Sequence, residues 1–319
     1  MFYFDRGPWF IYSLSINAAA TKFSEVYFRL MPERGKYGRQ DFFATLEVKI
    51  FTRDFISMKK IKLYQIDAFT DRVFGGNPAA VCVLDAWLPN ETMQQIAAEN
   101  NLAETAFVVP KGEKYEITWF TPTVEVDLCG HATLAAAHVL FQYGSHTSST
   151  ITFLSRRSGV LTVEKNGDAL TLDFPADVLE PAETPEALIT ALGKAPQETY
   201  QGKTDYLLIY TSQADVEAFN PDIALINTVP ARGIIVSAPG DEVDFVSRFF
   251  CPQVGIPEDP VTGSAHTSLT PYWSKRLGKK TMTARQLSKR QGALQCEFLD
   301  DRVKITGKAV TYLKGEIEV

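Results

Sequence analysis

A repeated pattern of residues constrains the fold of this chain more than any other feature. The tripeptide FTP at residues 120–122 is followed 10 residues further on by GHA at 130–132, and FCP at 250–252 is followed after 13 residues by GSA at 263–265. A repeat of this length is too widely spaced for a solenoid and indicates a duplicated domain. A chance match between short motifs is the competing interpretation.

The chain length fits a duplication, because 319 residues suffice for two domains at roughly 150 residues each. A stretch rich in Pro, Glu and Ala over residues 175–196 marks the boundary, which gives domains at 58–176 and 177–319, with the last strand free to return to the first domain. Residues 1–57 are expected to be an extension, either a misassigned start or a loosely ordered segment. Asp5 and Pro8 do not fit a secretory signal peptide.

Hydrophobic patterning predicts many short strands and few helices. Residues 131–141, which follow Gly130, are apolar nearly all round and predict a buried helix. Residues 264–273, which follow Gly263, predict a second helix. A third helix is expected after an N-cap at Asn90, and a hairpin at residues 166–167. Each copy is therefore expected to be a mostly β domain around one buried helix, which makes the fold class α+β.

Composition excludes several classes of function. The net charge is −6 and the sequence pI is 5.4, so the basic footprint of a nucleic-acid-binding protein is missing. No apolar run approaches the roughly 20 residues of a membrane-spanning helix. The four cysteines are scattered and form no C-x-x-C pair, which favours a cytoplasmic location. Neither a G-x-G-x-x-G nor a Walker A sequence is present, so the sequence indicates no cofactor.

The starts of the two buried helices are the places where chemistry is expected. The first backbone N–H groups of a helix are unpaired and carry partial positive charge, so two facing helix starts would hold a carboxylate or stabilise an enolate. Ionisable or nucleophilic side chains lie near these starts in the sequence; they are Glu104, Cys129, His131, Glu258, Asp259, Ser264 and His266.

Each of these side chains also has a structural interpretation. Glu104 precedes an apolar strand and is either an acid–base group or a solvated turn residue. His131 is either a neutral hydrogen-bond partner of the substrate or a structural histidine. Cys129 at a helix N-terminus is expected to have a lowered pKa, or else to be a buried small hydrophobe. Asp259 and Ser264 would serve equally as turn and cap residues.

A metal site is not expected. His131 and His138 lie seven residues apart on one helix face, but no carboxylate or third ligand stands at a useful spacing from them in the sequence.

Four blocks in this order resemble the signature motifs of the PhzF-like family, the phenazine-biosynthesis-like isomerases of the diaminopimelate epimerase fold. They are GGNPAAV at residues 75–81, NLAETAF at 101–107, CGHATL at 129–134 and EDPVTGSA at 258–265. The resemblance covers Met58 to Val319 and leaves residues 1–57 outside. It implies two pseudo-symmetric domains, each a β-barrel-like sheet around a central helix, an active site between them, and a homodimer.

The same resemblance assigns roles to single residues. It places the catalytic glutamate at Glu104 and the supporting catalytic residues at His131, Asp259 and Ser264. The substrate-binding residues it implies are Asn77, Cys129, Gly130, Thr262 and Gly263, with the backbone N–H groups of the two glycines on the substrate carboxylate. It implies no metal and no cofactor.

The function expected from these observations is a cofactor-independent isomerase that moves a proton on a small carboxylate substrate, with Glu104 as general acid and base. One alternative is an amino-acid epimerase or racemase that uses Cys129 with Glu104 or Asp259. Related racemases place a cysteine on each side of the substrate carbon, and the block at 258–265 has no thiol, so a symmetric two-thiol reaction is doubtful. The other alternative is a non-catalytic metabolite-binding protein.

Overall fold

The computed structural model describes residues 9–12, 22–32, 44–54, 59–144 and 146–319. The chain divides into two units, residues 1–59 together with Val319, and residues 60–318. Among the described helices, none is long and apolar enough to cross a membrane.

The described parts of the N-terminal extension form a three-stranded antiparallel sheet. Its strands are β1 (Trp9–Tyr12), β2 (Lys22–Pro32) and β3 (Ala44–Asp54), with β2 in the centre. The expectation of a loosely ordered extension concerns residues 1–8, 13–21, 33–43 and 55–58 as well, and these lie outside the described residues.

The second unit begins with a half built from eight strands and two helices, here called the first half. Its elements are β4 (Lys60–Ala68), β5 (Asn77–Val83), α1 (Asn90–Asn100), β6 (Glu104–Lys111), β7 (Lys114–Phe120), β8 (Glu125–Val126), α2 (Gly130–Tyr143), β9 (Thr150–Ser155), β10 (Gly159–Asn166) and β11 (Ala169–Pro175). The hairpin expected at residues 166–167 joins β10 to β11. The N-cap of α1 is Pro89, one residue before the expected Asn90.

The remainder of this unit contains the second half, from β13 to β19, and two flanking strands. Its elements are β12 (Glu180–Pro181), α3 (Glu186–Leu192), β13 (Glu198–Gln201), β14 (Asp205–Ile209), α4 (Gln213–Ala218), α5 (Ile223–Ile226), β15 (Gly233–Pro239), β16 (Phe245–Phe250), a 3-10 turn (Pro252–Val254), α6 (Gly263–Leu277), β17 (Thr281–Gln286), β18 (Gly292–Leu299), β19 (Arg302–Gly307) and β20 (Ala309–Glu318).

The two halves share one strand topology. In the first half β5 is parallel to β6 across α1, and β7 is parallel to β9 across α2. In the second half β14 is parallel to β15 across α4 and α5, and β16 is parallel to β17 across α6. The other neighbours within each half are antiparallel. Parallel neighbours require a crossover, which a helix commonly supplies, so helices recur at matching places in the two halves.

The halves join through their last strands, because β11 pairs with β19. The strand that follows each half then pairs with the opposite half: β12 lies on β13, and β20 lies on β4. The chain is therefore pseudo-symmetric within this unit. The boundary at residues 176/177 falls between β11 and β12 and stays a prediction.

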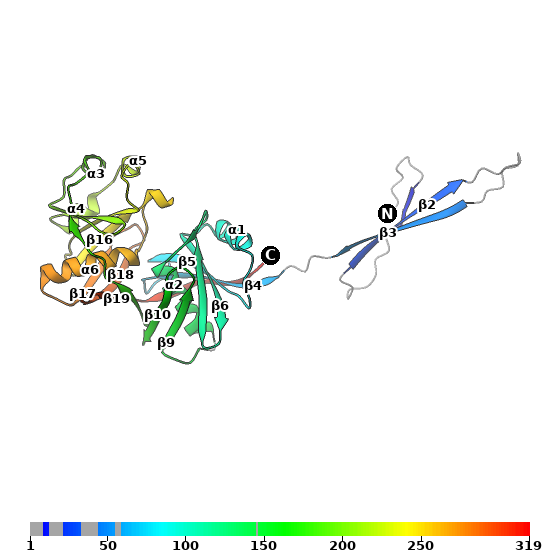
Figure 1. Ribbon diagram of the computed structural model, residues 1–319, viewed down its shortest axis with the longest axis horizontal. Helices are drawn as coiled ribbons and strands as arrows, with labels where there is room; N and C mark the ends of the chain where they lie inside the picture. Colours follow the sequence, from blue (N-terminus) through cyan, green and yellow to red (C-terminus); the bar gives the residue numbers. More distant parts are fainter. Residues whose placement is uncertain (1–8, 13–21, 33–43, 55–58, 145) are drawn as a thin grey trace, which may run out of the picture. The chain divides into compact units, whose positions relative to one another are not determined.

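Each half contains one long helix with mostly buried residues, α2 in the first half and α6 in the second (Figure 1). Helix α2 packs on β4, β5, β6, β11 and β20, and α6 packs on β14, β17, β18 and β19. The sequence allows this because α2 carries four alanines in its first two turns and is buried nearly all round. In α6, Trp273 stacks on Phe245 and donates from its indole N–H to Ser237 Oγ at 2.9 Å. Both helices are thereby fixed, and so are the positions of their first residues.

Candidate active site

The starts of the two buried helices meet. Helix α2 begins at Gly130 after the N-cap Cys129, and α6 begins at Gly263 after the N-cap Thr262. A Cβ atom placed on either glycine would lie 3.6 Å from the Cα atom of the other. The two backbones therefore approach closely, and neither N-cap side chain hydrogen-bonds the helix start. Unpaired N–H groups of both helices are available there to an anionic group.

A cavity of about 690 Å³ opens at this meeting point. Eight of the nine predicted site residues line it; they are Glu104, Cys129, Gly130, His131, Asp259, Thr262, Gly263 and Ser264. They come from four separate places in the chain, at the start of β6, at the start of α2, in the loop before α6 and in the first turn of α6. The cavity belongs to both halves.

Glu104, His131 and Cys129 form a compact cluster at one side of this cavity. Oε2 of Glu104 lies 3.1 Å from Nε2 of His131, and Sγ of Cys129 lies 3.4 Å from Nδ1 of the same ring. The side chain of Glu104 is 13% exposed, so the carboxylate is accessible from the cavity although largely buried. Ligand atoms of the three residues lie within 4.8 Å of one another. The fold thus brings a carboxylate and a thiol to His131, where the sequence showed no third ligand.

The ionisation of this cluster differs from the expectation. Burial, reinforced by the charge of Glu104, raises the pKa of the Cys129 thiol to about 11, so the expected lowering by the helix start is wrong. Burial also lowers the pKa of His131, but Cys129 and Glu104 together more than offset it, and the pKa lies well above 6.5. With a neutral thiol, the charge of Glu104 is what raises the pKa of His131, a shift opposite in direction to the one expected from the helix start.

Asn77 lies behind the cavity and is not among its lining residues. It is fully buried at the start of β5, and its Nδ2 donates to Asp259 Oδ1 at 2.7 Å and to the Val261 carbonyl at 3.0 Å. The same nitrogen lies 3.1 Å from Nδ1 of His131. Asn77 therefore positions an acid from the second half against a histidine from the first, a role other than the expected contact with substrate.

Asp259 is a buried carboxyl group held by neutral donors. Oδ1 accepts from Asn77, and Oδ2 accepts from the hydroxyl of Thr262 at 2.6 Å. Gln286 fixes this loop, since its Nε2 donates to the Asp259 carbonyl at 2.7 Å and its Oε1 accepts from the Thr262 N–H at 2.8 Å. Burial, opposed by His131 and reinforced by Glu104, raises the pKa of Asp259 to about 6.

Comparison with known proteins identifies the family of this chain. The family model described as phenazine biosynthesis-like protein, PhzC-PhzF, matches residues 66–315. The chain belongs to this family. It is 50% identical over 260 residues to an uncharacterized isomerase of Pseudomonas aeruginosa, a match that covers 82% of this chain and 100% of that protein.

Solved structures place the PhzC-PhzF chain in the expected fold class. A PhzF-family protein of Enterococcus faecalis is 46% identical, with a TM-score of 0.80 over 82% of this chain and 100% of the other. A probable proline racemase of Agrobacterium radiobacter K84 is 11% identical, with a TM-score of 0.53 over 81% of this chain and 92% of that chain. The latter shows a shared fold alone. The α+β, pseudo-symmetric architecture predicted from the sequence is confirmed.

One further side chain in the cavity of this PhzC-PhzF protein, that of Arg232, was not predicted from the sequence. Arg232, which directly precedes β15, donates from Nε to Asp205 Oδ1 at 2.8 Å and from its second terminal nitrogen to Asp205 Oδ2. Its other terminal nitrogen donates to Ser264 Oγ at 3.0 Å. Because Ser264 Oγ accepts from Arg232, its own O–H is free to donate into the cavity. No sequence motif includes Arg232. Its position directly before an apolar strand, which it shares with Glu104, was the one indication of a site residue.

Three other candidates lie away from the reactive cluster. Glu258 forms a bidentate pair with Arg248, at 2.7 and 2.9 Å. His266 is fully buried inside α6 and donates from Nδ1 to the Thr262 carbonyl at 2.8 Å; burial lowers its pKa to about 4. His138 bonds Thr311 at 3.0 Å. None of them lines the cavity.

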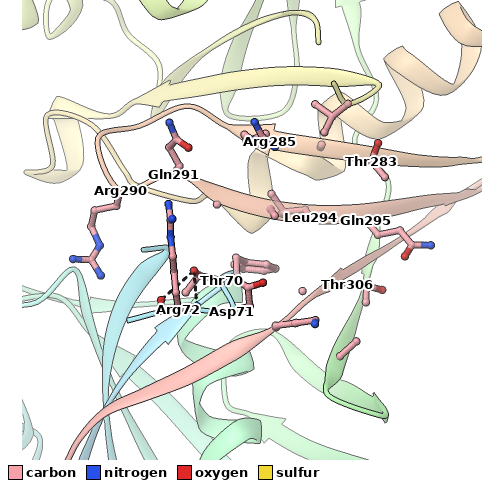
Figure 2. Close-up of a pocket in the computed structure, with 18 residues that line it drawn as sticks. Thr70, Asp71, Arg72, Thr283, Arg285, Arg290, Gln291, Leu294, Gln295 and Thr306 are labelled. Atoms are coloured by element: carbon pink, nitrogen blue, oxygen red, sulfur yellow. Dashed lines mark hydrogen bonds between the residues drawn. The ribbon is translucent and has the colours of Figure 1, made fainter. Parts of the chain in front are cut away.

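A second cavity, of about 620 Å³, follows the β17–β18 hairpin and contains none of the predicted site residues (Figure 2). Two of its cationic side chains, those of Arg285 and Arg290, are engaged in structural contacts. Arg290 donates to the carbonyls of Gly75 and Gly76 and to Asp67, and Arg285 contacts Glu242 at 3.3 Å. The cavity at the helix starts is therefore the candidate active site.

Proposed function

We propose that this protein is an isomerase that moves a proton between carbon atoms of a small carboxylate substrate. The observation that carries the proposal is the buried Glu104 carboxylate beside His131, in a cavity bounded by two helix starts. A carboxylate in this setting accepts a proton from carbon and returns it, while fixed donors stabilise the anion formed between the two steps.

The proposed reaction consists of two proton transfers by Glu104. Glu104 takes a proton from a carbon atom next to an electron-withdrawing group, and the electron pair of the broken C–H bond moves into that group as an enolate-type anion. The N–H groups at Gly130 and Gly263 and the hydroxyl of Ser264 donate to the anionic oxygens. Glu104 then returns the proton to a different carbon atom, so that substrate and product have the same composition.

His131 and Asp259 support this transfer from two sides. The raised pKa of His131 favours its cation, and Nε2 of this ring lies 3.1 Å from Oε2 of Glu104. The pKa of Asp259, raised to about 6, lets this group exchange a proton near neutral pH. Both side chains are fixed through Asn77. Side chains of the protein thus carry every proton in the proposed reaction. The homodimer implied by the resemblance stays a prediction.

The experiment is a screen of small carboxylate metabolites in deuterium oxide, followed by mass spectrometry. Wild-type protein should add deuterium to the true substrate and form an isomer of it. Glu104→Gln should reduce this exchange by about 10²–10⁴-fold, because it removes the general base and retains the side-chain shape. Glu258→Gln is the matched control and should exchange normally. Full exchange by Glu104→Gln would refute the role of Glu104.

Cys129 supports a second candidate, epimerisation at one carbon with a thiol as one of the two proton carriers. Its sulfur lines the cavity 3.4 Å from His131. Against this candidate, burial raises the thiol pKa to about 11, and the corresponding residue before Gly263 is Thr262. If alkylated Cys129 leaves turnover unchanged, epimerisation by this thiol is excluded. A chain that binds metabolites but never exchanges protons would favour a non-catalytic role.

A further inference from the structure

We propose that Arg232 and Asp205 form a specificity subsite, which binds a neutral oxygen atom of the substrate and disfavours a second carboxylate. The oxygen belongs to a hydroxyl or a carbonyl group, so the substrate is a hydroxy or oxo monocarboxylate. Both residues line the cavity, where the side chain of Arg232 is 35% exposed and that of Asp205 is 4% exposed. The identification of this acid as the substrate rests on the proposed function, whereas the binding preference does not.

The position of Arg232 follows from the pseudo-symmetry of the two halves. Glu104 opens β6, beside β5, and Arg232 directly precedes β15, beside β14. Oε2 of Glu104 lies 3.1 Å from His131, the second residue of α2. In the same way, a terminal nitrogen of Arg232 lies 3.0 Å from Oγ of Ser264, the second residue of α6. Arg232 therefore faces the cavity from the second half, directly beside one of the helix starts.

The guanidinium group of Arg232 is held in a fixed direction. Two of its N–H groups donate to the two oxygens of Asp205, and a third donates to Ser264. The group also lies over the ring of Phe249, 5.4 Å from its centroid. Because a guanidinium group has five N–H donors, two of them have no acceptor among the described residues. These two donors are preorganised for an oxygen atom that enters the cavity.

Asp205 determines which kind of oxygen atom binds there. Its carboxylate balances the charge of Arg232, so the subsite supplies hydrogen-bond donors without a net positive charge. Five more carboxyl groups line the cavity; they are Glu104, Glu125, Asp127, Asp177 and Asp259. The bases among the described lining residues are Arg232, Lys203 and His131. A second substrate carboxylate would be repelled by this excess of acids, whereas a neutral oxygen accepts from Arg232 without that cost.

The test measures binding of two series of saturated acids to the full chain by ligand-detected NMR titration at about pH 7.5. One series is propanoate, 3-hydroxypropanoate and malonate, and the other is butanoate, 4-hydroxybutanoate and succinate. Within a series only the terminal group changes, from methyl to hydroxymethyl to carboxylate. In at least one series the hydroxy acid should bind about 10-fold or more tightly than the parent acid, because it gains a hydrogen bond from a charged donor. The dicarboxylate should bind more weakly than the hydroxy acid.

Two variants separate the charge of the subsite from its donors. Asp205→Asn leaves the charge of Arg232 unbalanced, so the dicarboxylate should gain about 10-fold in affinity and bind more tightly than the hydroxy acid. Arg232→Gln should lose the preference for the hydroxy acid over the parent acid. Asp173→Asn is the control, since Asp173 also accepts from an arginine, Arg302 at 2.9 Å, and does not line the cavity. It should keep the wild-type order, and thermal unfolding should show that each variant is folded.

The subsite would be overturned by equal affinities within both series, by the absence of binding of all six acids, or by a dicarboxylate that binds wild type most tightly. An unchanged order in folded Asp205→Asn would overturn it as well, and if that variant does not fold, wild type and Arg232→Gln decide. The predicted order of binding without proton exchange on any carboxylate in deuterium oxide would leave the subsite standing and contradict the proposed function. Exchange on a carboxylate that has no hydroxyl or carbonyl group beyond the carboxylate would do the reverse.

Discussion

The starts of α2 and α6 match residue by residue, yet they carry different chemistry. In order, the first reads Cys129, Gly130, His131, Ala132 and Thr133, and the second reads Thr262, Gly263, Ser264, Ala265 and His266. The glycine and alanine are retained, and they allow the two helices to abut. The fifth residue donates to the carbonyl of the N-cap residue in both helices. Thr133 Oγ1 donates to the Cys129 carbonyl, and His266 Nδ1 donates to the Thr262 carbonyl.

The positions on either side of the glycine are the ones that differ. The first helix start places a thiol and an imidazole beside Glu104, whereas the second places two hydroxyls that bond Asp259 and Arg232. The residue at the entrance to the corresponding strand follows the same division, with the acid Glu104 opening β6 and the base Arg232 preceding β15. Under the proposed function, one duplicated scaffold thus holds a proton-carrying side around Glu104 and a hydrogen-bonding side around Arg232. This asymmetry favours transfer by one carboxylate over a symmetric two-base reaction.

Making the first helix start resemble the second should have the largest effect. His131→Ser removes the ring whose Nε2 lies 3.1 Å from Oε2 of Glu104, and we expect proton exchange to fall by about 10²–10⁴-fold. The measurement is the deuterium exchange rate of the identified substrate. His138→Ser is the matched control on the same helix, because His138 bonds Thr311 outside the cavity. A variant His131→Ser with the activity of His138→Ser would show that His131 is structural.

The buried carboxyl group of the second side should make stability depend on pH. The pKa of Asp259 is about 6 in the folded protein, above its ordinary value of 3.8, so the folded chain binds the proton more tightly than the unfolded chain. This contribution is complete below about pH 4 and is lost as the pH rises through about 6; it is on the order of 3 kcal/mol.

Urea unfolding of wild type and Asp259→Asn at several pH values measures this contribution. The fall in unfolding free energy between about pH 4 and pH 7 should be smaller in Asp259→Asn by on the order of 3 kcal/mol. Glu164→Gln, which replaces an exposed carboxylate 3.7 Å from Lys304, is the control and should keep the wild-type slope. Equal slopes in all three proteins would contradict the raised pKa of Asp259.

Arg232 tests the hydrogen-bonding side. Lysine retains the charge but cannot hold both Asp205 and Ser264 in fixed directions, so Arg232→Lys should lower kcat/KM by about 10–100-fold, which is about 1.4–2.7 kcal/mol. If Arg232 orients the Ser264 hydroxyl toward the transition state, kcat falls more than KM rises. Arg248→Lys is a matched control, since Arg248 also pairs with a carboxylate and lies over a phenylalanine ring. The same kinetic losses in both variants would indicate general destabilisation.

The sequence was sufficient to predict the scaffold because glycine starts and apolar periodicity are local signals. It predicted both buried helices and the hairpin at residues 166–167. The place of Glu104 in the cavity was implied by the resemblance to the family, because the local pattern also allowed a solvated turn residue. It did not predict α3 within the Pro-rich stretch at 175–196, where Leu188 and Leu192 pack in the core of the second half. There the tertiary burial of a short helix outweighs a composition typical of a linker.

The ionisation of the site could not be predicted from the sequence. A helix start alone lowers a thiol pKa. In Cys129, burial and the charge of Glu104, which is far away in the sequence but close in space, raise the pKa instead. The position of Asn77 between His131 and Asp259 likewise depends on contacts 54 and 182 residues apart along the chain. Such long-range contacts leave no spacing pattern that a sequence could reveal.

The smallest effect is expected where the N-cap residues are made alike. Cys129→Thr gives the first helix start the residue of the second, and exchange should change by less than about 10-fold, since a thiol with a pKa of about 11 carries no proton in the proposed reaction. A reaction that uses Cys129 as a proton carrier predicts a loss of about 10²–10⁴-fold instead. Thr262→Cys is the reciprocal variant, and it removes the hydroxyl that donates to Asp259. If Thr262→Cys, which has a thiol at both helix starts, gains proton exchange at one chiral carbon, the N-cap residue selects between isomerisation and racemisation. If Cys129→Thr alone abolishes turnover, the thiol of Cys129 belongs to the proton-carrying side.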